Sequence, residues 1–362
     1  MKLLVSGGMG FIGSAFIRNH INKNPNDVII NVDNLTTGSN IKNLEGIDKT
    51  NYQFIEEDIQ NTEVIDRIVS DIDVLVNFAA ETHVDRSIAN PKQFLETNIL
   101  GTHSLLEATK KHEKLFLHVS TDEVYGDALD QNSFTETSLL NPSNPYSASK
   151  AAAEHLVNSF VRTYKTKSII TRCTNNFGPF QSPEKLIPKT IIRAEKNLKV
   201  PLYGDGNQIR SWIHVLDHVS AIESLITSGS VGETYNITSW NEISNKTIVE
   251  KILNQMDRTS DLIEYVGVRP GHDKRYSINC EKIHNEVGWK PEYNFESALK
   301  QTVDWYLQNK QWWEPLADEK CFIHNLGLLV GKIEIFSHRF SRTDWATNCK
   351  RFIKIKSSFF II

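Results

Sequence analysis

Short apolar runs alternate with helical patterns of apolar residues along the first half of the chain. The runs typical of buried strands cover residues 2–6, 28–33, 52–56, 74–80 and 115–121. The patterns typical of amphipathic helices cover residues 14–22, 62–70, 93–110 and 147–164. Because this alternation is characteristic of a parallel sheet joined by right-handed helical crossovers, we expect an α/β fold with a doubly wound parallel sheet.

A glycine-rich turn joins the first expected strand to the first expected helix. Gly7, Gly10 and Gly13 have the spacing G-x-x-G-x-x-G, with Phe11 and Ile12 between the last two. The first glycine permits a tight turn, the second lets a pyrophosphate approach the backbone, and the third lets the helix pack closely on the strand. The positive end of the helix dipole faces the phosphates. The pattern predicts a Rossmann-type dinucleotide site, and a plain turn is the alternative.

Two aspartates at later strand ends bear on which dinucleotide is bound. Asp33 ends the second expected strand, 20 residues after Gly13, where a carboxylate accepts hydrogen bonds from ribose hydroxyls and repels a 2′-phosphate. We therefore expect NAD rather than NADP, with Asn34 beside it. Asp58 and Ile59 follow the third expected strand, where the adenine ring would lie. The alternative is that these aspartates only initiate a turn or end a strand.

Tyr146 and Lys150 open the last helix of this half with the spacing Y-x-x-x-K. Residues four apart on a helix share a side, and an ammonium beside a phenol stabilises the phenolate and lowers the phenol's pKa. Such a tyrosine is a general base for an alcohol that is being oxidised, and the lysine also suits the cofactor's ribose. The spacing recurs by chance, but here it follows a glycine-rich turn and a strand that ends at Thr121.

Bulk composition excludes several classes of protein. The chain has 362 residues, of which 40% are hydrophobic and 23% charged, and its formal net charge is −4; this is typical of a globular protein and argues against a nucleic-acid partner. The first apolar run is too short for a signal peptide or a membrane span, so we expect a cytoplasmic protein without a membrane partner. Four cysteines without a C-x-x-C pair indicate reduced thiols, and no histidine spacing indicates a metal.

The C-terminal end differs in composition from the rest of the chain. From Lys320 onward there are eight basic and two acidic residues, mixed with phenylalanine and isoleucine. We interpret residues 317–362 as an atypical tail, either a lineage-specific extension or the product of a reading-frame change. A basic arm for a membrane surface or a nucleic acid is the weaker alternative.

Longer motifs, in order along the chain, carry a resemblance to a known family. They are the turn 7–13, AAETHVDRS at 79–87, STDEVYG at 120–126, YSASK at 146–150, RCTNNFGP at 172–179, PEKLIP at 183–188, YGDGNQIRSW at 203–212 and RPGHD at 269–273. Over about residues 1–316 the chain resembles the extended short-chain dehydrogenase/reductases, and within them the dTDP-glucose 4,6-dehydratases. The resemblance implies an NAD-binding domain of residues 1–174 with a returning part around 208–240, and a smaller mixed α/β nucleotide-sugar domain of residues 175–316.

The family's reaction comprises oxidation of a nucleotide-linked hexose at C4, loss of water across C5 and C6, and reduction at C6 on bound NAD. The elimination needs an acid for the departing C6 hydroxyl and a base for the C5 proton. The resemblance assigns these roles to Asp122 and Glu123, and places Thr121 on the C4 oxygen. A nucleotide-sugar 4-epimerase is the alternative, because it needs only Tyr146 and Lys150. A non-catalytic NAD-binding protein is a weaker alternative for the whole chain. For Asp122 and Glu123 the weaker alternative is a solvated acidic turn.

The resemblance also implies binding residues and a partner. The cofactor pocket would further contain Ala79, Ala80, Thr97 and Asn176. The nucleotide sugar, with thymidine favoured over uridine and cytidine, would contact Thr121, His83, Asn175, Lys185, Leu186, Pro201, Tyr203, Arg210, Asn245, Arg269, Asp273 and Tyr276. Arg210 suits a diphosphate because a planar guanidinium binds phosphate oxygens in pairs. We expect a homodimer through helices 93–110 and 147–164.

Overall fold

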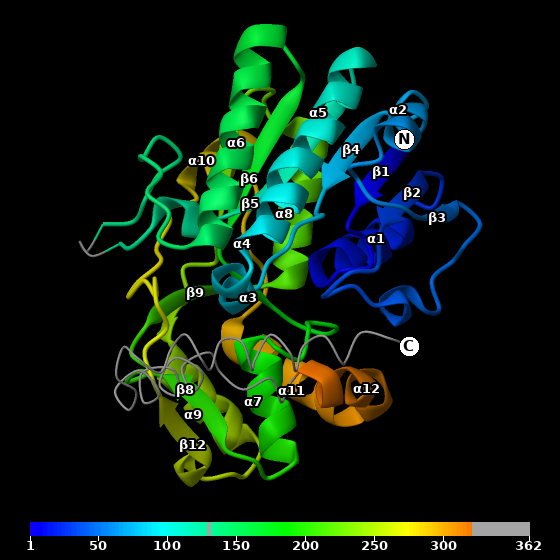
Figure 1. Ribbon diagram of the computed structural model, residues 1–362. Coiled ribbons are helices and arrows are strands. Elements are labelled where there is room, and N and C mark those ends of the chain that lie inside the picture. Colours follow the sequence, from blue (N-terminus) through cyan, green and yellow to red (C-terminus); the bar gives the residue numbers. More distant parts are fainter. Residues whose placement is uncertain (129–131, 321–362) are drawn as a thin grey trace, which may run out of the picture.

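A seven-stranded parallel sheet forms the centre of the computed structural model, which describes residues 1–128 and 132–320 (Figure 1). Its strand order is β10-β6-β5-β4-β1-β2-β3. The strands are β1 Lys2–Ser6, β2 Val28–Asp33, β3 Tyr52–Glu56, β4 Val74–Asn77, β5 Leu115–Thr121, β6 Ser168–Cys173 and β10 Thr234–Ile237. Every neighbouring pair is parallel, and the order reverses beside β1. The doubly wound fold predicted from the sequence is confirmed.

Helices cover both faces of this sheet, so its central strands are buried on each side. One face packs against α1 Phe11–Lys23, α8 Val215–Ser228 and α10 Glu281–Val287, and the other against α2 Thr62–Val69, α5 Thr102–Lys111 and α6 Pro145–Tyr164. Apolar strand residues therefore occur in continuous runs, as parallel sheets require. These runs made the first five strands predictable, although β4 ends three residues earlier than expected.

The expected helix 93–110 is interrupted. The chain after β4 instead forms α3 Val84–Ala89, α4 Pro91–Phe94, a π-helical turn η2 Leu95–Gly101 and then α5. The side-chain oxygen of Asn98 in that turn accepts a hydrogen bond from the backbone N–H of Glu81, and its side-chain nitrogen donates to the Glu81 carbonyl. The same nitrogen donates to the hydroxyl of Ser149 in α6. These side-chain bonds anchor the wide turn beside the site, and single π turns of this kind occur frequently at functional sites.

A second lobe lies below the sheet in Figure 1. It contains a three-stranded sheet of β7 Asn175–Phe177, β9 Ile209–His214 and β11 Glu242–Ser244, and a parallel pair of β8 Val200–Tyr203 and β12 Ile263–Val266. Its helices are α7 Leu186–Glu195, α9 Asn245–Gln255, α11 Phe295–Gln308 and α12 Lys310–Lys320. Short 3-10 turns also occur along the chain at η1 Ile41–Leu44, η3 Asp122–Tyr125 and η4 Ser260–Leu262. Between β9 and β11 the chain returns to the first lobe as α8 and β10. Across the described ranges, no helix is long and apolar enough to cross a membrane.

The expected boundary of the tail at residue 317 lies inside α12. Trp312, Trp313 and Ala317 are buried in the core of the second lobe, with Leu316 packed beside them. This helix therefore belongs to the folded lobe, and most of the expected tail, residues 321–362, lies outside the described residues.

A chain that ends at Lys320 should fold and bind ligands like the full chain, whereas a chain that ends at Pro315 should be less stable. The second truncation removes Leu316 and Ala317 from a buried cluster, and each lost buried side chain typically costs a protein about 1–3 kcal/mol. Thermal unfolding of the two truncations beside the full chain measures this. Equal melting temperatures for both would show that α12 contributes nothing after Pro315.

Candidate active site

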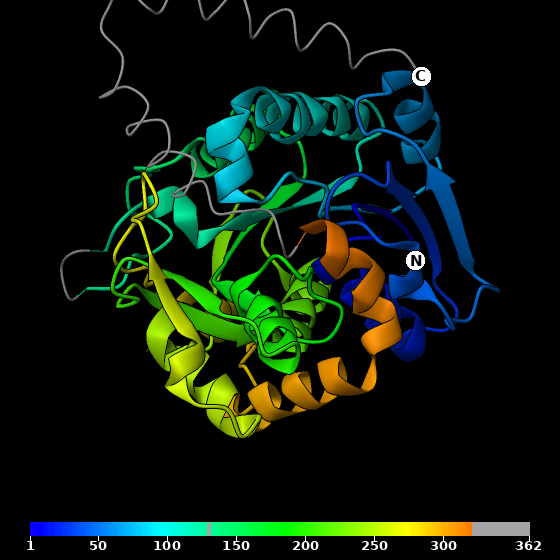
Figure 2. The same cartoon turned by 60° about the horizontal axis from the view of Figure 1, so that its bottom comes forward.

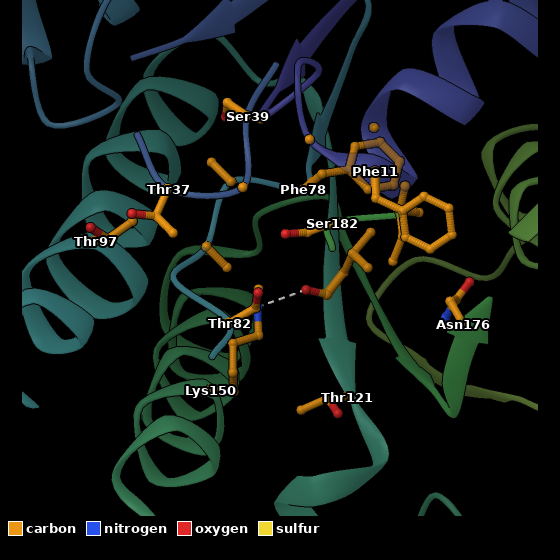
Figure 3. Close-up of a pocket in the computed structure, with 18 of the residues that line it drawn as sticks. Phe11, Thr37, Ser39, Phe78, Thr82, Thr97, Thr121, Lys150, Asn176 and Ser182 are labelled. Atoms are coloured by element: carbon orange, nitrogen blue, oxygen red, sulfur yellow. Dashed lines mark hydrogen bonds between the residues drawn. The ribbon is translucent and has the colours of Figure 1, made fainter. Parts of the chain in front are cut away.

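The main pocket lies along the carboxyl edge of the parallel sheet, where parallel strands in such folds bind ligands (Figure 3). The glycine-rich turn, the loop after β2 and the end of β4 form one part of its lining. The end of β5, the start of α6, the β6–β7 junction and residues between 181 and 185 form another part, and Glu57, Ile59, Thr82 and Thr97 also line it. The second lobe thus contributes to the same pocket as the first.

The glycine-rich turn has the close approaches that its spacing predicts. Gly7 has φ +74°, and a Cβ there would lie 2.5 Å from the backbone nitrogen of Ala79. A Cβ on Gly13 would lie 2.4 Å from the carbonyl oxygen of Gly7, so only glycine lets α1 begin this close to the turn. Gly10, Phe11 and the following residues of α1 line the pocket. The open helix N-terminus and the tight turn fit a pyrophosphate.

Asp33 lies at the pocket wall at the end of β2. Its carboxylate accepts hydrogen bonds from the backbone of Met9 (2.9 Å) and Leu35 (2.9 Å) and from the Ser39 hydroxyl (2.8 Å). Burial raises the pKa of Asp33, although these bonds oppose the shift. Each carboxylate oxygen accepts more than one hydrogen bond, so the group remains suited to ribose hydroxyls. The arrangement fits NAD better than a 2′-phosphorylated dinucleotide.

Asp33→Ala should weaken NAD binding and reduce discrimination against NADP. The substitution removes a negative charge that repels a 2′-phosphate and also removes the acceptors for ribose hydroxyls. Dissociation constants for both dinucleotides, measured by titration calorimetry on wild type and variant, test this. A wild type that binds both equally well would remove the argument for Asp33.

Of the residues near the expected adenine position, some line the pocket and Asp58 does not. Ile59 and its neighbour Glu57 line the pocket, as does Asn34. Asp58 is not among the lining residues, and its carboxylate accepts a hydrogen bond of 2.8 Å from the Asn34 amide. A role for Asp58 through Asn34 remains a prediction from the sequence.

Tyr146 and Lys150 are buried side by side at the start of α6. The helix begins sharply, because Asn144 caps it with Ser147 in a reciprocal capping box and Pro145 occupies its first turn. Lys150 donates a hydrogen bond of 2.7 Å to the carbonyl of Val119 in β5. Figure 3 shows Lys150 extending from its helix to this bond, with Thr121 further along the same strand.

The expected lowering of the Tyr146 pKa does not appear in this geometry. Burial raises the pKa of Tyr146 well above its ordinary value, and the charge of Glu123 adds to the rise, while a hydrogen bond with Thr121 opposes it. Lys150 donates to Val119 rather than to the phenol. Burial lowers the pKa of Lys150 to about 8, with Glu154 acting against the shift. The protein alone thus holds a protonated phenol.

Asp122 and Glu123 are adjacent but lie in different environments. One carboxylate oxygen of Asp122 accepts a hydrogen bond of 3.3 Å from Thr121, and the other is buried with no partner among the described residues. Burial, followed by the charge of Glu123, raises the pKa of Asp122 to about 8. Glu123 instead accepts a hydrogen bond from the Asn144 amide (3.5 Å), and its carboxylate lies 3.4 Å from the Tyr276 hydroxyl. At neutral pH Asp122 therefore keeps a proton to donate.

A group of residues from the second lobe extends this cluster away from the sheet. The Arg210 guanidinium lies 4.1 Å from the centre of the Tyr276 ring and donates a hydrogen bond of 2.9 Å to the carbonyl of Asp273. The Tyr276 hydroxyl donates to the Asp273 carboxylate (2.8 Å). Arg210 is buried rather than exposed on the surface. Its position near Asp122 and Glu123 suits an anionic part of a substrate.

A second polar group joins α3 to the second lobe. Tyr203 donates a hydrogen bond of 3.0 Å to Asp85, and Arg269 lies 3.9 Å from the same carboxylate. His83 lies 3.9 Å from Glu184, and burial, with the nearby charge of Lys185, lowers the pKa of His83 to about 4. His83 is therefore neutral at physiological pH.

The structure separates the predicted site residues into two sets. The lining of the main pocket includes Gly7, Gly10, Phe11, Ile12, Gly13, Asp33, Asn34, Ile59, Ala79, Ala80, Thr97, Thr121, Asp122, Glu123, Tyr146, Lys150, Asn175, Asn176 and Lys185. Outside that lining lie Asp58, His83, Leu186 at the start of α7, Pro201 and Tyr203 in β8, Arg210 in β9, Asn245 at the start of α9, Arg269, Asp273 and Tyr276.

Several lining residues were not predicted from the sequence. They are chiefly the loop 36–39 after β2, and Glu57, Phe78, Thr82, Cys173, Gln181, Ser182 and Glu184. The loop's position directly after Asp33 was the available signal, since such loops border the ligand at this edge of the sheet. No comparable signal marks Gln181 or Ser182, which reach the pocket through the packing of the two lobes.

Tyr146 and Lys150 line one pocket with a dinucleotide-type turn, an arrangement typical of the extended short-chain dehydrogenase/reductase class. A family model described as GDP-mannose 4,6 dehydratase matches residues 4–302. The dTDP-glucose 4,6-dehydratase of Salmonella typhimurium is 46% identical over 341 residues, covering 86% of this chain and 94% of the relative. That of Neisseria meningitidis is 44% identical over 351 residues, covering 90% and 99%. The chain belongs to the dTDP-glucose 4,6-dehydratase family.

Solved structures agree with this assignment. The dTDP-glucose 4,6-dehydratase of Streptomyces venezuelae, with NAD and TYD bound, has a TM-score of 0.85 and 41% identity, over 87% of this chain and all of that one. A UDP-glucose 4-epimerase from Thermotoga maritima has a TM-score of 0.80 but only 27% identity, over 86% of this chain and all of that one. The epimerases thus share the fold at a greater distance in sequence.

Proposed function

We propose that this chain is an NAD-dependent dehydratase that converts dTDP-glucose to dTDP-4-keto-6-deoxyglucose and water. The observation that carries the proposal is the buried Asp122 carboxyl beside Glu123. One of its oxygens has no hydrogen-bond partner in the described part of the chain, and it shares a pocket with Tyr146 and Lys150. An epimerase needs Tyr146 and Lys150 but does not need Asp122 and Glu123. The activity named for the curated relatives, and the NAD in the related crystal structures, support the same conclusion.

NAD fits the first lobe, as the glycine-rich turn and the Asp33 wall indicate. The pyrophosphate would lie on Gly10 and the N-terminus of α1, the adenosine ribose on Asp33, and the nicotinamide ribose on Lys150. When bound, NAD supplies the two-electron acceptor and donor of the reaction, and the positive charge of its oxidised ring favours ionisation of the buried Tyr146 phenol.

Tyr146 would take the proton of the 4-hydroxyl as C4 is oxidised. Tyr146 and Thr121 line the same pocket, so both side chains could hold the C4 oxygen. The Lys150 ammonium on the next turn of α6 adds a positive charge that favours the phenolate. The resulting C4 ketone acidifies the proton on C5, which prepares the elimination.

Glu123 and Asp122 would then divide the elimination between them. Glu123, as a carboxylate, would remove the C5 proton, and Asp122, protonated at neutral pH, would give its proton to the departing C6 hydroxyl. Because the two residues are consecutive in η3, one short turn holds acid and base in register with one sugar ring. Both carboxyl groups would return to their starting charge when a proton returns to C5 and Asp122 is reprotonated.

The diphosphate would meet the residues of the second lobe. Arg210 presents a planar guanidinium held by the Asp273 carbonyl and the Tyr276 ring, and Lys185 lies at the pocket wall. Together they supply positive charge between the sugar site and the β8 residues Pro201 and Tyr203. Leu186, Asn245 and Arg269 would border the nucleoside in this proposal.

Product analysis on a panel of nucleotide sugars tests the proposed function. Purified enzyme would be supplied separately with dTDP-glucose, UDP-glucose and CDP-glucose, and the products would be analysed by proton NMR. We expect a C6 methyl group and a C4 keto group, formed fastest from dTDP-glucose. A galactose-configured product with an intact C6 hydroxyl would replace the dehydratase by the epimerase.

The homodimer is also a proposal. In α6, Ala148 and Tyr164 are exposed and Ala152 is half-buried, and Leu95 and Leu100 of η2 are also exposed. Apolar side chains on these helices suit a bundle formed with a second copy. Light scattering after size-exclusion chromatography would give the mass, and a monomer at micromolar concentration would contradict the dimer.

A cytoplasmic location is proposed on the buried free thiols of Cys173 and Cys280.

A further inference from the structure

The last described helix lies against the cofactor side of the first lobe. Figure 2 shows the orange C-terminal helices beside the blue N-terminal part of the chain. The indole nitrogen of Trp312 in α12 donates a hydrogen bond of 3.0 Å to the side-chain oxygen of Asn43 in η1. Both side chains are buried, with 7% and 1% of their surface exposed. A residue far along the sequence thus contacts the segment that follows Asp33.

Asn43 connects this contact to the glycine-rich turn. Its amide nitrogen donates a hydrogen bond of 2.9 Å to the carbonyl of Met9. The backbone nitrogen of Met9 in turn donates to the Asp33 carboxylate (2.9 Å). Asn40, which begins η1, also donates its backbone nitrogen to Met9 (2.9 Å). Three successive hydrogen bonds therefore run from Trp312 to the carboxylate expected to hold the adenosine ribose.

A second set of contacts, through Arg18 and Phe180, supports the same segment. Arg18 of α1 donates to the carbonyl of Asn43 (2.6 Å), and its guanidinium lies 4.8 Å from the centre of the Phe180 ring. Phe180 in turn packs edge-on against Trp312, with ring centroids 5.6 Å apart. Asn43 is thus enclosed by Arg18, Phe180 and Trp312, so its position depends on both lobes.

We propose that Trp312 is a positioning residue for the cofactor, and that α12 holds NAD in place through Asn43 and Met9. The inference rests on the proposed binding of NAD. Trp312 does not line the main pocket, so it acts only through the loop 36–43 and the turn. Without the indole N–H, the buried oxygen of Asn43 would have no partner within residues 1–128 and 132–320. Since an unsatisfied buried acceptor is costly, the amide and the turn beneath it shift. This brace suits an enzyme that reuses one bound cofactor in every turnover.

Trp312→Phe, compared with Trp313→Phe, tests the proposal. Both substitutions replace a buried indole with a smaller ring and remove one indole hydrogen bond, because Trp313 donates to the carbonyl of Tyr306 (2.7 Å). Only the first bond leads to the cofactor turn. NAD carried by each gel-filtered protein would be released by acid and quantified, and its rate of loss on dilution followed. Trp312→Phe should lose NAD about tenfold faster than wild type, and Trp313→Phe within about twofold.

Further measurements separate bracing from general damage. Asn43→Ala should lose NAD at least as fast as Trp312→Phe, and the double variant no faster than Asn43→Ala alone, because both act through one bond. Saturating NAD should restore the turnover of Trp312→Phe. Equal NAD loss in both tryptophan variants, or firm NAD retention in Asn43→Ala, overturns the proposal. A wild type that binds no NAD would instead overturn the proposed function.

Discussion

Asp122→Asn and Glu123→Gln should each slow formation of the 6-deoxy product by about 10²–10⁴-fold, the usual contribution of a general acid or base. The first keeps the size of the side chain but removes its transferable proton, and the second removes the base. In the proposed mechanism oxidation at C4 depends on Tyr146 and Lys150 and not on the two carboxyl groups, so both variants should still oxidise substrate. They should accumulate NADH and a 4-keto-glucose intermediate.

Isotope exchange distinguishes the two carboxyl groups. In deuterium oxide, exchange at C5 should collapse in Glu123→Gln and fall less in Asp122→Asn, because the proposed mechanism assigns removal of that proton to Glu123 alone. The wild-type elimination should also decline as pH rises through about 8, where Asp122 loses its proton, and Asp122→Asn should lack this decline. Wild-type turnover by both variants would contradict the assignment of the carboxyl pair.

Tyr146→Phe should abolish C4 oxidation and with it every later step. The ring would still pack edge-on against Phe94 (centroids 6.3 Å apart), so we expect a folded protein that binds NAD and substrate. Without the hydroxyl no base receives the 4-hydroxyl proton, and no NADH should appear in a stopped-flow trace. Tyr52→Phe, which also removes one tyrosine hydroxyl from the first lobe, is the matched control and should oxidise normally. NADH formation by Tyr146→Phe at the control's rate would remove Tyr146 from the mechanism.

Local patterns made the first lobe predictable. The five early strands and the glycine-rich turn depend on short stretches of sequence whose apolar runs and spacings repeat a known geometry. Tyr146 and Lys150 are on one helix, and Asp122 and Glu123 directly follow one strand. The members of each pair are therefore close in space because they are close in the sequence. The family resemblance then supplied the second-lobe residues, among which the structure brings Arg210, Asp273 and Tyr276 together.

What the sequence did not predict depends on contacts between distant segments. The direction of the Tyr146 pKa shift follows from burial and from Glu123, which only the folded pocket reveals. The interruption of helix 93–110 depends on Asn98 reaching Ser149. The bond from Trp312 to Asn43 joins residues 269 positions apart. No periodicity or motif in either segment marks such a partner.

The return of the chain to complete the sheet has a consequence for synthesis. β6 pairs with β10 on its outer side, but β10 begins only at Thr234. At a translation rate of about 5–20 residues per second, β6 therefore waits roughly 3 to 12 s with an unpaired edge. Such an edge readily pairs with other chains. The nascent enzyme is thus most exposed to aggregation after its cofactor turn has formed, and a fragment of residues 1–174 would keep that exposed edge permanently.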